Sequence, residues 1–187
     1  MDSVTRFAMA SREIGLSVGE PPTTKGHTPS VFSELPKLLE RAGPGRKGET
    51  GSITGIFSVL VEGGEMDEPV ADSVRGILDG HIVMDRKIGK QGKHPAIDIL
   101  KSVSRMMPAC NAPREKDIIQ EAKKQLSAYE DMAEMIKIGA YRAGSNQEID
   151  HAIKLYPKID TFLNQDIGES LDRASCYNQL EAILGMT

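Results

Sequence analysis

The chain has 187 residues, enough for one or two domains with a buried core, and its 39% hydrophobic and 27% charged residues are typical of a globular protein. The formal net charge of −4, the absence of Trp and the 4% aromatic content argue against a nucleic-acid partner. Cys110 and Cys176 lie far apart and outside any CxxC or Cys/His cluster, which argues against a disulfide framework or zinc site and favours a reducing, cytoplasmic location. No apolar run approaches the roughly 18 residues that a membrane span needs.

The first part of the chain predicts an α/β arrangement. Residues 4–14 are predicted as a helix, and residues 15–29, rich in Gly, Pro and Thr, as a loop. Leucines at helical spacing predict a second helix over 30–42, followed by a turn at 43–50. The run 52–61 is short, apolar and partly β-branched, which predicts a buried strand of a mostly parallel sheet.

The next elements continue this alternation. Pro69 and the acidic residues before it predict the start of a helix that runs to about Leu78. Residues 81–85 are a second strand candidate, and the Gly- and Lys-rich stretch 87–95 is predicted as a loop. The apolar residues from Ile97 onward predict an extended segment that leads into the Ser-Val-Ser-Arg sequence ending at Arg105.

Beyond Pro113 the sequence predicts helices and almost no strand. Apolar residues recur at spacings of three and four, with Gly144, Pro157 and Gly168 as breaks between helices. The predicted helical segments are 114–142, 146–155, 159–166 and 174–184. We therefore predict an α/β domain at 1–112 and an all-α domain at 113–187.

One segment imitates a phosphate-binding loop. Residues 43–50 have the spacing G-x-x-x-x-G-K-[ST], but Glu49 stands where the lysine must be, and a carboxylate there repels phosphate. The preceding segment is also predicted as a helix, whereas a phosphate-binding loop follows a strand. We therefore predict a surface turn here and no phosphate cradle within these 187 residues.

Few single residues point to chemistry by themselves. Asp2 could hold Mg²⁺ through water, as the aspartate at the end of a buried strand does in P-loop ATPases, although a lone terminal Asp is more often solvated. Arg105 follows an extended segment and could be an arginine finger, although a surface Arg is the commoner reading. Glu13 and Glu20 flank a loop without a nucleophile partner and are predicted to be solvated. The four histidines show no metal-binding spacing.

Taken in order, the sequence motifs are much more specific than any single residue. The chain resembles the flagellar export and type III secretion ATPases of the rotary ATPase superfamily. The resemblance is close over residues 1–108 and looser through the helical tail. It rests on DSVTRFA at 2–8, REIG at 12–15, GEPP at 19–22, PSVF at 29–32, LLERAG at 38–43, GSIT at 51–54, DEP at 67–69, ILDGHIV at 77–83, PAID at 95–98 and SVSR at 102–105.

The resemblance implies roles for four residues in binding ATP and Mg²⁺. Asp2 falls on the Walker B aspartate that orients Mg²⁺, and Arg105 on the arginine finger that acts on nucleotide bound by a neighbouring subunit. His94 stands where relatives usually carry a Tyr that packs on the adenine; an imidazole can still stack, with less area. Tyr141 is expected near the adenine as well, on a weaker alignment.

The resemblance also implies a C-terminal part of a P-loop NTPase with a RecA-like, mostly parallel sheet, followed by an all-α domain. Because the phosphate-binding loop and the catalytic Glu of relatives are not in this sequence, the chain is expected to be inactive alone. Expected partners are identical subunits in a ring of six, export-apparatus regulator and central stalk proteins, and export substrates and chaperones. The expected location is cytoplasmic, peripheral at the inner face of the plasma membrane, beside the membrane gate.

Two other functions stay open at this point. The helical segment could be a non-enzymatic module that binds partners or export cargo. The chain could instead belong to a subunit of an ATP synthase or vacuolar-type ATPase, although the LLERAG and ILDGHI sequences favour the export family.

Overall fold

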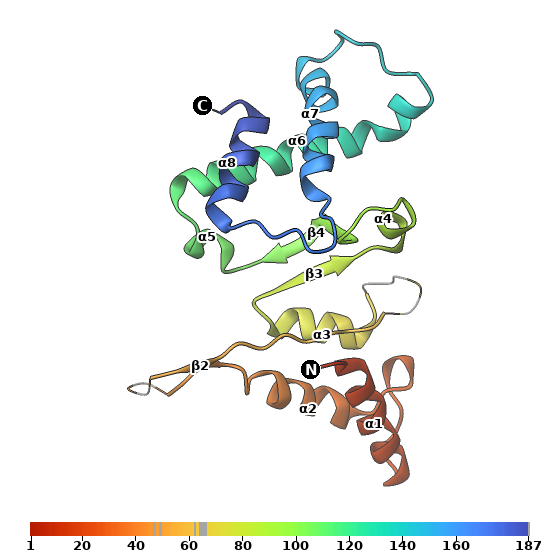
Figure 1. Cartoon of the computed structure of the whole chain (residues 1–187). Coiled ribbons are helices and arrows are strands. Elements are labelled where there is room, and N and C mark those ends of the chain that lie inside the picture. Colours follow the sequence, from red (N-terminus) through yellow and green to blue (C-terminus); the bar gives the residue numbers. More distant parts are fainter. Residues whose placement is uncertain (47, 49, 62, 64–66, 187) are drawn as a thin grey trace. The chain divides into compact units, whose positions relative to one another are not determined.

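A computed structural model describes residues 1–46, 48, 50–61, 63 and 67–186. The chain forms two compact units, Met1–Asp79 and Gly80–Thr187 (Figure 1). The first unit is built from three helices, and the second from a two-stranded sheet and helices. An α/β arrangement followed by an all-α region is thereby confirmed. The predicted domain boundary at 112/113 differs from the division between compact units, because the β3–β4 hairpin clusters with the helices that follow it.

The helices of the first unit begin where local signals predict. Helix α1 (Val4–Ser17) is capped by Ser3, whose hydroxyl accepts a hydrogen bond from the Arg6 amide at 3.3 Å. Helices α2 (Pro29–Leu39) and α3 (Pro69–Ile77) each have a proline in the first turn, where no amide donor is needed. A 3₁₀ turn, η1 (Thr24–Gly26), lies within the predicted loop.

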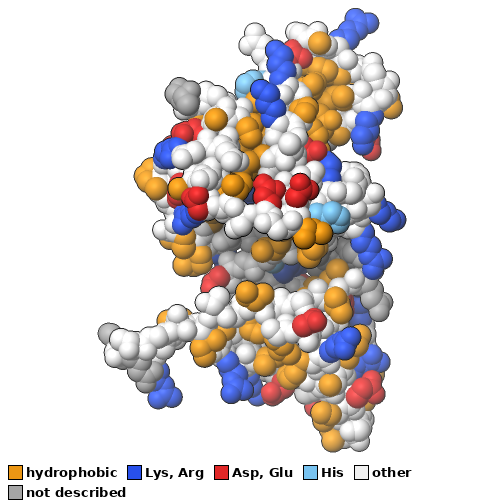
Figure 2. Space-filling model, in the orientation of Figure 1, with side chains coloured by type: hydrophobic (Ala, Val, Ile, Leu, Met, Phe, Trp, Pro, Cys, Tyr) orange, Lys and Arg blue, Asp and Glu red, His pale blue; other side chains and the backbone are white. Residues whose placement is uncertain are grey.

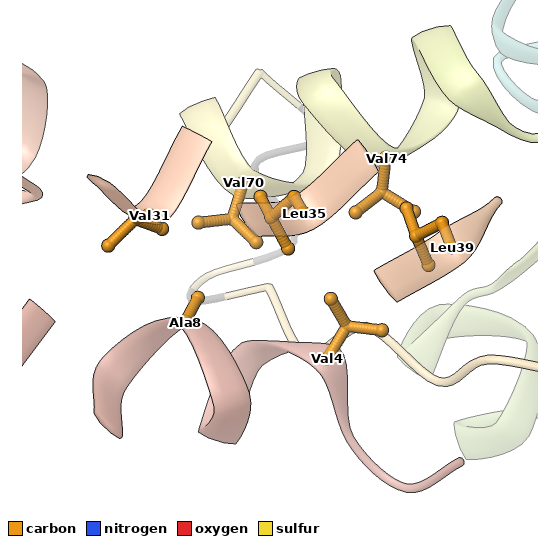
Figure 3. Close-up of a cluster of buried hydrophobic side chains, with 7 residues drawn as sticks. All are labelled: Val4, Ala8, Val31, Leu35, Leu39, Val70 and Val74. Atoms are coloured by element: carbon orange, nitrogen blue, oxygen red, sulfur yellow. The ribbon is translucent and has the colours of Figure 1, made fainter. Parts of the chain in front are cut away.

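The core of the first unit is the contact surface of these three helices (Figure 3). Each helix contributes side chains at helical spacing, and all of them are at most 3% exposed. The cluster consists of Val4, Ala8, Val31, Leu35, Leu39, Val70 and Val74. Phe7, Phe32, Phe57 and Val59 pack against it from its edge.

The predicted buried strand over 52–61 is wrong for most of its length. Strand β2 covers only Ser52–Ile53 and pairs antiparallel with β1 (Gly43–Pro44). Residues 54–61 belong to no strand that the structure describes, and they are exposed or half-buried. Of the turn predicted at 43–50, Gly43–Pro44 is strand β1, and Lys47 and Glu49 of the rejected phosphate-loop sequence lie outside the described residues.

A short stretch of parallel pairing is found where the chain begins. The Met1 ammonium donates to the Ile56 carbonyl at 2.7 Å, and the Ser58 amide donates to the Met1 carbonyl at 3.0 Å. These two bonds place Met1 beside Phe57 with both chains running in the same direction. The extended segment 56–58 therefore continues the expected parallel pairing, even though the two ladders with named strands are antiparallel.

The second unit begins with an antiparallel hairpin. Strand β3 (Gly80–Met84) confirms the predicted strand and pairs with β4 (Ile97–Ser104), with a register irregularity between His81 and Val83. The connection 87–95, predicted as a loop, contains the short helix α4 (Arg86–Lys90). Asp85 explains the difference, because its carboxylate caps this helix by accepting from the Lys87 amide at 2.7 Å. A short helix, α5 (Met107–Cys110), follows β4.

Three longer helices pack together in the rest of this unit. They are α6 (Pro113–Lys137), α7 (Gln147–Leu163) and α8 (Arg173–Leu184). Their shared core consists of Ile118, Ala122, Leu155, Ile159 and Leu184. At the surface, Arg114 of α6 donates to Asn178 of α8 at 2.8 Å, and Arg173 of α8 donates to Glu115 of α6 at 2.7 Å. These reciprocal arginine contacts tie α8 to the first turns of α6.

The predicted break at Pro157 is wrong. Helix α7 continues through it, although proline cannot donate to the Ile153 carbonyl and costs about 3 kcal/mol in a helix interior. Leu155 and Ile159, on either side of Pro157, are both buried, and burying each side chain contributes roughly 1.5–3 kcal/mol. Packing of this apolar stripe therefore outweighs the cost of the proline.

Large hydrophobic side chains also reach the surface of both units (Figure 2). Ile14 on α1 is 66% exposed, and Ile138, next to the end of α6, is 78% exposed. None of the helices that the structure describes is both long and apolar enough to cross a membrane.

We predict that Leu35→Ala lowers the free energy of unfolding of the first unit by about 2–5 kcal/mol, because it leaves a cavity among the packed helices. Urea unfolding followed by circular dichroism measures the change. Ile14→Ala is the control and should stay within about 0.5 kcal/mol of the parent chain, because Ile14 is largely exposed. Equal losses for both variants would contradict the proposed core.

Candidate functional site

Asp2 lies at the end of the parallel pairing that Met1 makes. Its side chain is exposed, and its carboxylate accepts a hydrogen bond from the Ser58 hydroxyl. Helix α1 starts two residues later, so Asp2 occupies the connection between an extended segment and a helix. This is the position that the sequence predicts for a Mg²⁺-orienting carboxylate at the carboxyl end of a strand.

His94 lies in the second unit, at the entrance to β4. The residue is exposed, while its backbone amide and carbonyl both make hydrogen bonds. Its amide donates to the Asn164 side-chain oxygen at 3.0 Å, and its carbonyl accepts from the Gln165 amide at 2.7 Å. The backbone of His94 is therefore fixed by the end of α7, and its imidazole is available to a ligand at the surface.

Lys93, next to His94, makes an ion pair that sequence analysis missed. Its ammonium lies 2.5 Å from the Asp160 carboxylate and 5.8 Å from the centre of the Tyr156 ring. Tyr156 in turn stacks on Tyr129 of α6, with ring centres 3.6 Å apart. The one local signal was the spacing of Tyr156 and Asp160, which places both on one face of α7. Nothing in the sequence pairs Asp160 with Lys93, which lies 67 positions away.

The surroundings of this ion pair shift two pKa values. Burial disfavours the charged form of Lys93, but the hydrogen bond to Asp160 and the nearby negative charge outweigh burial and raise its pKa. Burial raises the pKa of the Tyr156 hydroxyl, and the Asp160 charge acts in the same direction. The arrangement therefore favours a protonated lysine beside a neutral tyrosine.

Lys93 and its neighbours line a cleft within the second unit. Its volume is about 740 Å³, and its walls come from β4, α4, α6 and α7. Pro95, which follows His94, is part of this wall together with Tyr129, Tyr156 and Asp160. Lys93 and Pro95, on either side of His94 in the sequence, therefore both line the cleft.

Arg105 lies at the opposite end of β4 from His94. It is exposed and follows Ser104 directly, whose hydroxyl accepts from the Met107 amide at 3.1 Å and holds the bend after the strand. The eight residues of β4 are not fully extended, because its ends, Ile97 and Ser104, pair with Met84 and Gly80 of the five-residue strand β3. At about 3.3 Å per residue of β3, the two ends of β4 are roughly 13 Å apart. The structure therefore presents Arg105 and His94 at different ends of one strand, and their assignment to different nucleotides stays a prediction.

Tyr141 has a local role in the connection between α6 and α7. Its hydroxyl lies 3.0 Å from both the Asn146 carbonyl and the Asp150 carboxylate. Asp150 also accepts from the Gly144 amide at 2.8 Å, so this tyrosine closes a turn. The predicted contact of Tyr141 with adenine stays a prediction.

Glu20 is half-buried and makes a hydrogen bond that the sequence did not predict. Its carboxylate accepts from the Ser30 amide at 3.1 Å, at the start of α2. The hydrogen bonds from the Ser30 side chain and backbone lower the pKa of Glu20. Glu20 therefore has a structural role, closing the loop between α1 and α2.

Asp2 fits a Mg²⁺ site in which phosphates and water supply the remaining ligands. Within the described part of the chain, no cluster of three or more His, Cys, Asp or Glu side chains could hold a metal by itself. Mg²⁺ in nucleotide sites is commonly held by one or two carboxylates together with substrate phosphates and water, and one exposed carboxylate matches that pattern. The sequence has no G-x-x-x-x-G-K-[ST] loop for the phosphates. The single carboxylate of Asp2 therefore fits one ligand position of such a Mg²⁺ site.

Comparison with known families agrees with this geometry. Residues 1–104 match the profile of the ATP synthase alpha/beta family, nucleotide-binding domain. Because this match covers more than half of the chain, the chain belongs to the ATP synthase alpha/beta family. Residues 112–182 match the C-terminal domain of the type III secretion system ATPase EscN.

Individual relatives include flagellar and type III secretion ATPases. A flagellum-specific ATP synthase of Caulobacter vibrioides is 57% identical over 98% of the chain. The assembled ATPase EscN of the enteropathogenic E. coli type III secretion system matches the structure with a TM-score of 0.91, at 41% identity over 97% of the chain. EscN in complex with its central stalk EscO matches with a TM-score of 0.84, also at 41% identity over 97% of the chain. The chain spans 42%, 43% and 42% of the length of these three relatives, respectively.

We predict that stability declines at alkaline pH partly through the Lys93 site. Raised folded-state pKa values stabilise the fold fully below the unfolded values, 10.5 for Lys93 and 10.0 for Tyr156, and this stabilisation is lost as pH rises through the folded values. Lys93→Met should therefore flatten the decline of unfolding free energy as the pH rises above 10.5. The control is Lys158→Met, which removes an exposed lysine of α7 and should leave the slope unchanged. Indistinguishable slopes for the two variants would contradict this assignment.

Proposed function

We propose that this chain forms the distal part of the nucleotide-binding domain and the helical C-terminal domain of an ATPase that energises flagellar or type III protein export. The observation that carries the proposal is the pair of consecutive family matches. A nucleotide-binding domain over 1–104 is followed at 112–182 by a C-terminal domain specific to secretion ATPases. The second match favours an export ATPase over a subunit of an ATP synthase or vacuolar-type ATPase.

In this proposal the site residues divide between two nucleotides. Asp2 orients Mg²⁺ through water, and the exposed imidazole of His94 packs on adenine, with Tyr141 expected near adenine as well. Arg105 serves the neighbouring subunit's nucleotide, where its fixed positive charge stabilises the negative charge on the transferring phosphoryl group. The position of Arg105 at the far end of β4 from His94 supports this division.

The proposal includes assembly and location. The ATPase acts as a ring of identical subunits, with six expected, because Arg105 completes a neighbour's site. The structures of assembled EscN, and of EscN with its central stalk, support a ring and a stalk partner for this protein. Regulator proteins, export substrates and chaperones are the further partners proposed, at the inner face of the plasma membrane.

We predict that Arg105→Ala abolishes turnover but leaves nucleotide binding within a few-fold of the parent. The test uses a full-length chimera, in which this chain replaces the matching 188-residue segment of the Caulobacter relative. Loss of a finger arginine is expected to lower kcat by about 10³–10⁵-fold. Arg86→Ala, a change at another exposed arginine of the second unit, is the control and should keep its activity. Equal loss of binding and turnover in Arg105→Ala would instead assign this residue a structural role.

We also predict that the 187-residue chain by itself neither binds ATP tightly nor hydrolyses it. The β- and γ-phosphates have no loop to bind them in this sequence, and phosphate contacts supply most of the stabilisation in phosphoryl transfer. Isothermal titration with MgATP and a phosphate-release assay on the purified chain check both statements. Robust Mg²⁺-dependent hydrolysis by the purified chain would overturn this prediction.

A further inference from the structure

The segment that carries His94 is attached to helix α7 at several points. The His94 amide and carbonyl bond to Asn164 and Gln165, and the Lys93 ammonium bonds to Asp160. Lys93 and Asp160 are 67 positions apart, and His94 and Asn164 are 70 positions apart, so these are tertiary contacts. The position of His94 therefore depends on the end of α7.

The α7 end is itself firmly held. Asn164 is the residue that caps α7, and Asp166 and Gln165 both bond to Glu169, which closes the turn after the helix. One turn before its end, Asp160 receives the Lys93 ammonium, whose side chain is only 24% exposed. The contacts on His94 therefore come from an ordered structure.

The attachment extends to α6 through stacked aromatic rings. Lys93 lies against the Tyr156 ring, and Tyr156 stacks on Tyr129. Helices α6 and α7 also share the buried residues Ile118, Leu155 and Ile159. The segment before β4 is therefore linked, through α7, to the core of the helical region (Figure 1).

We propose that Asn164 and Asp160 are positioning residues that hold His94 in place for contact with the nucleotide base. This inference rests on the proposed function, in which His94 packs on adenine. Neither residue touches the nucleotide in this arrangement; each acts through the 93–95 segment. Because linkage is reciprocal, base binding at His94 stabilises the same arrangement of α7 that favours binding.

The test measures steady-state ATP hydrolysis by the chimera described above and by its Asn164→Ala variant. Asn164→Ala removes the acceptor of the His94 amide and should raise KM for ATP about three- to tenfold, with kcat at saturation unchanged. Asn164→Asp keeps an oxygen acceptor and should restore KM to near the parent value. Asp160→Asn, which weakens the tie to Lys93, should raise KM in the same direction. Lys158→Ala on the exposed face of α7 is the control and should leave KM unchanged.

Two further measurements separate positioning from general damage to the fold. Inhibition by tripolyphosphate, which has no base, should be the same in the parent and in Asn164→Ala. In a His94→Ala background, Asn164→Ala should cause no further rise in KM. Equal weakening of ATP and tripolyphosphate, or a full effect of Asn164→Ala without His94, would overturn the inference.

The outcome also distinguishes this inference from the proposed function. If the chimera hydrolyses ATP and Asn164→Ala leaves KM unchanged, the positioning role is wrong and the proposed function stands. If the folded chimera lacks ATPase activity, the proposed function fails, and with it the role of these residues toward a nucleotide. Amide hydrogen exchange gives an activity-independent check, because exchange at 93–97 should be faster in Asn164→Ala than in the parent, and unchanged exchange would overturn the attachment.

Discussion

The antiparallel ladder between β3 and β4 is the constraint on which the second unit depends. It fixes both ends of β4, with His94 before the strand and Arg105 after it. A ladder tolerates little change in register, because a shift of one residue moves every side chain to the other face. The irregularity between His81 and Val83 is absorbed locally, where the Ser102 hydroxyl accepts the Val83 amide at 3.0 Å. The two candidate residues thus keep a fixed separation within the unit.

Local sequence signals predicted the elements whose ends they define. Pro69 and the spaced leucines from 30 onward located helices α3 and α2, because caps and periodicity act within a few residues. The failures have tertiary causes. In the described part of the chain, residues 54–61 belong to no named strand despite their apolar sequence, and Pro157 lies in a helix that buried neighbours hold together. Helix α4 was missed because its capping carboxylate, Asp85, is a weaker sequence signal than the glycines and lysines around it.

The candidate site residues were identified from the order of the sequence motifs more than from the chemistry of any single residue. Asp2 and Arg105 were weak signals alone, and both follow extended segments in the structure, while their roles toward a nucleotide stay predictions. The contacts of His94 with α7 were beyond sequence reasoning, because they join residues about 70 positions apart through one side-chain oxygen and one amide. Tyr141 is a different case. The resemblance assigns it to a nucleotide, and in the structure its hydroxyl bonds to Asp150 in the connection between α6 and α7.

The proline inside α7 gives this helix unequal stiffness along its length. Upstream of Pro157 every turn can be closed by backbone hydrogen bonds, whereas at Pro157 the Ile153 carbonyl has lost its helical donor. A missing bond of this kind makes a helix easier to bend at that point. Both halves of α7 nevertheless pack on the shared core, with Leu155 before the proline and Ile159 after it. Helix α7 therefore relies on side-chain packing, in place of one backbone hydrogen bond, to keep the residues that contact Lys93 and His94 in position.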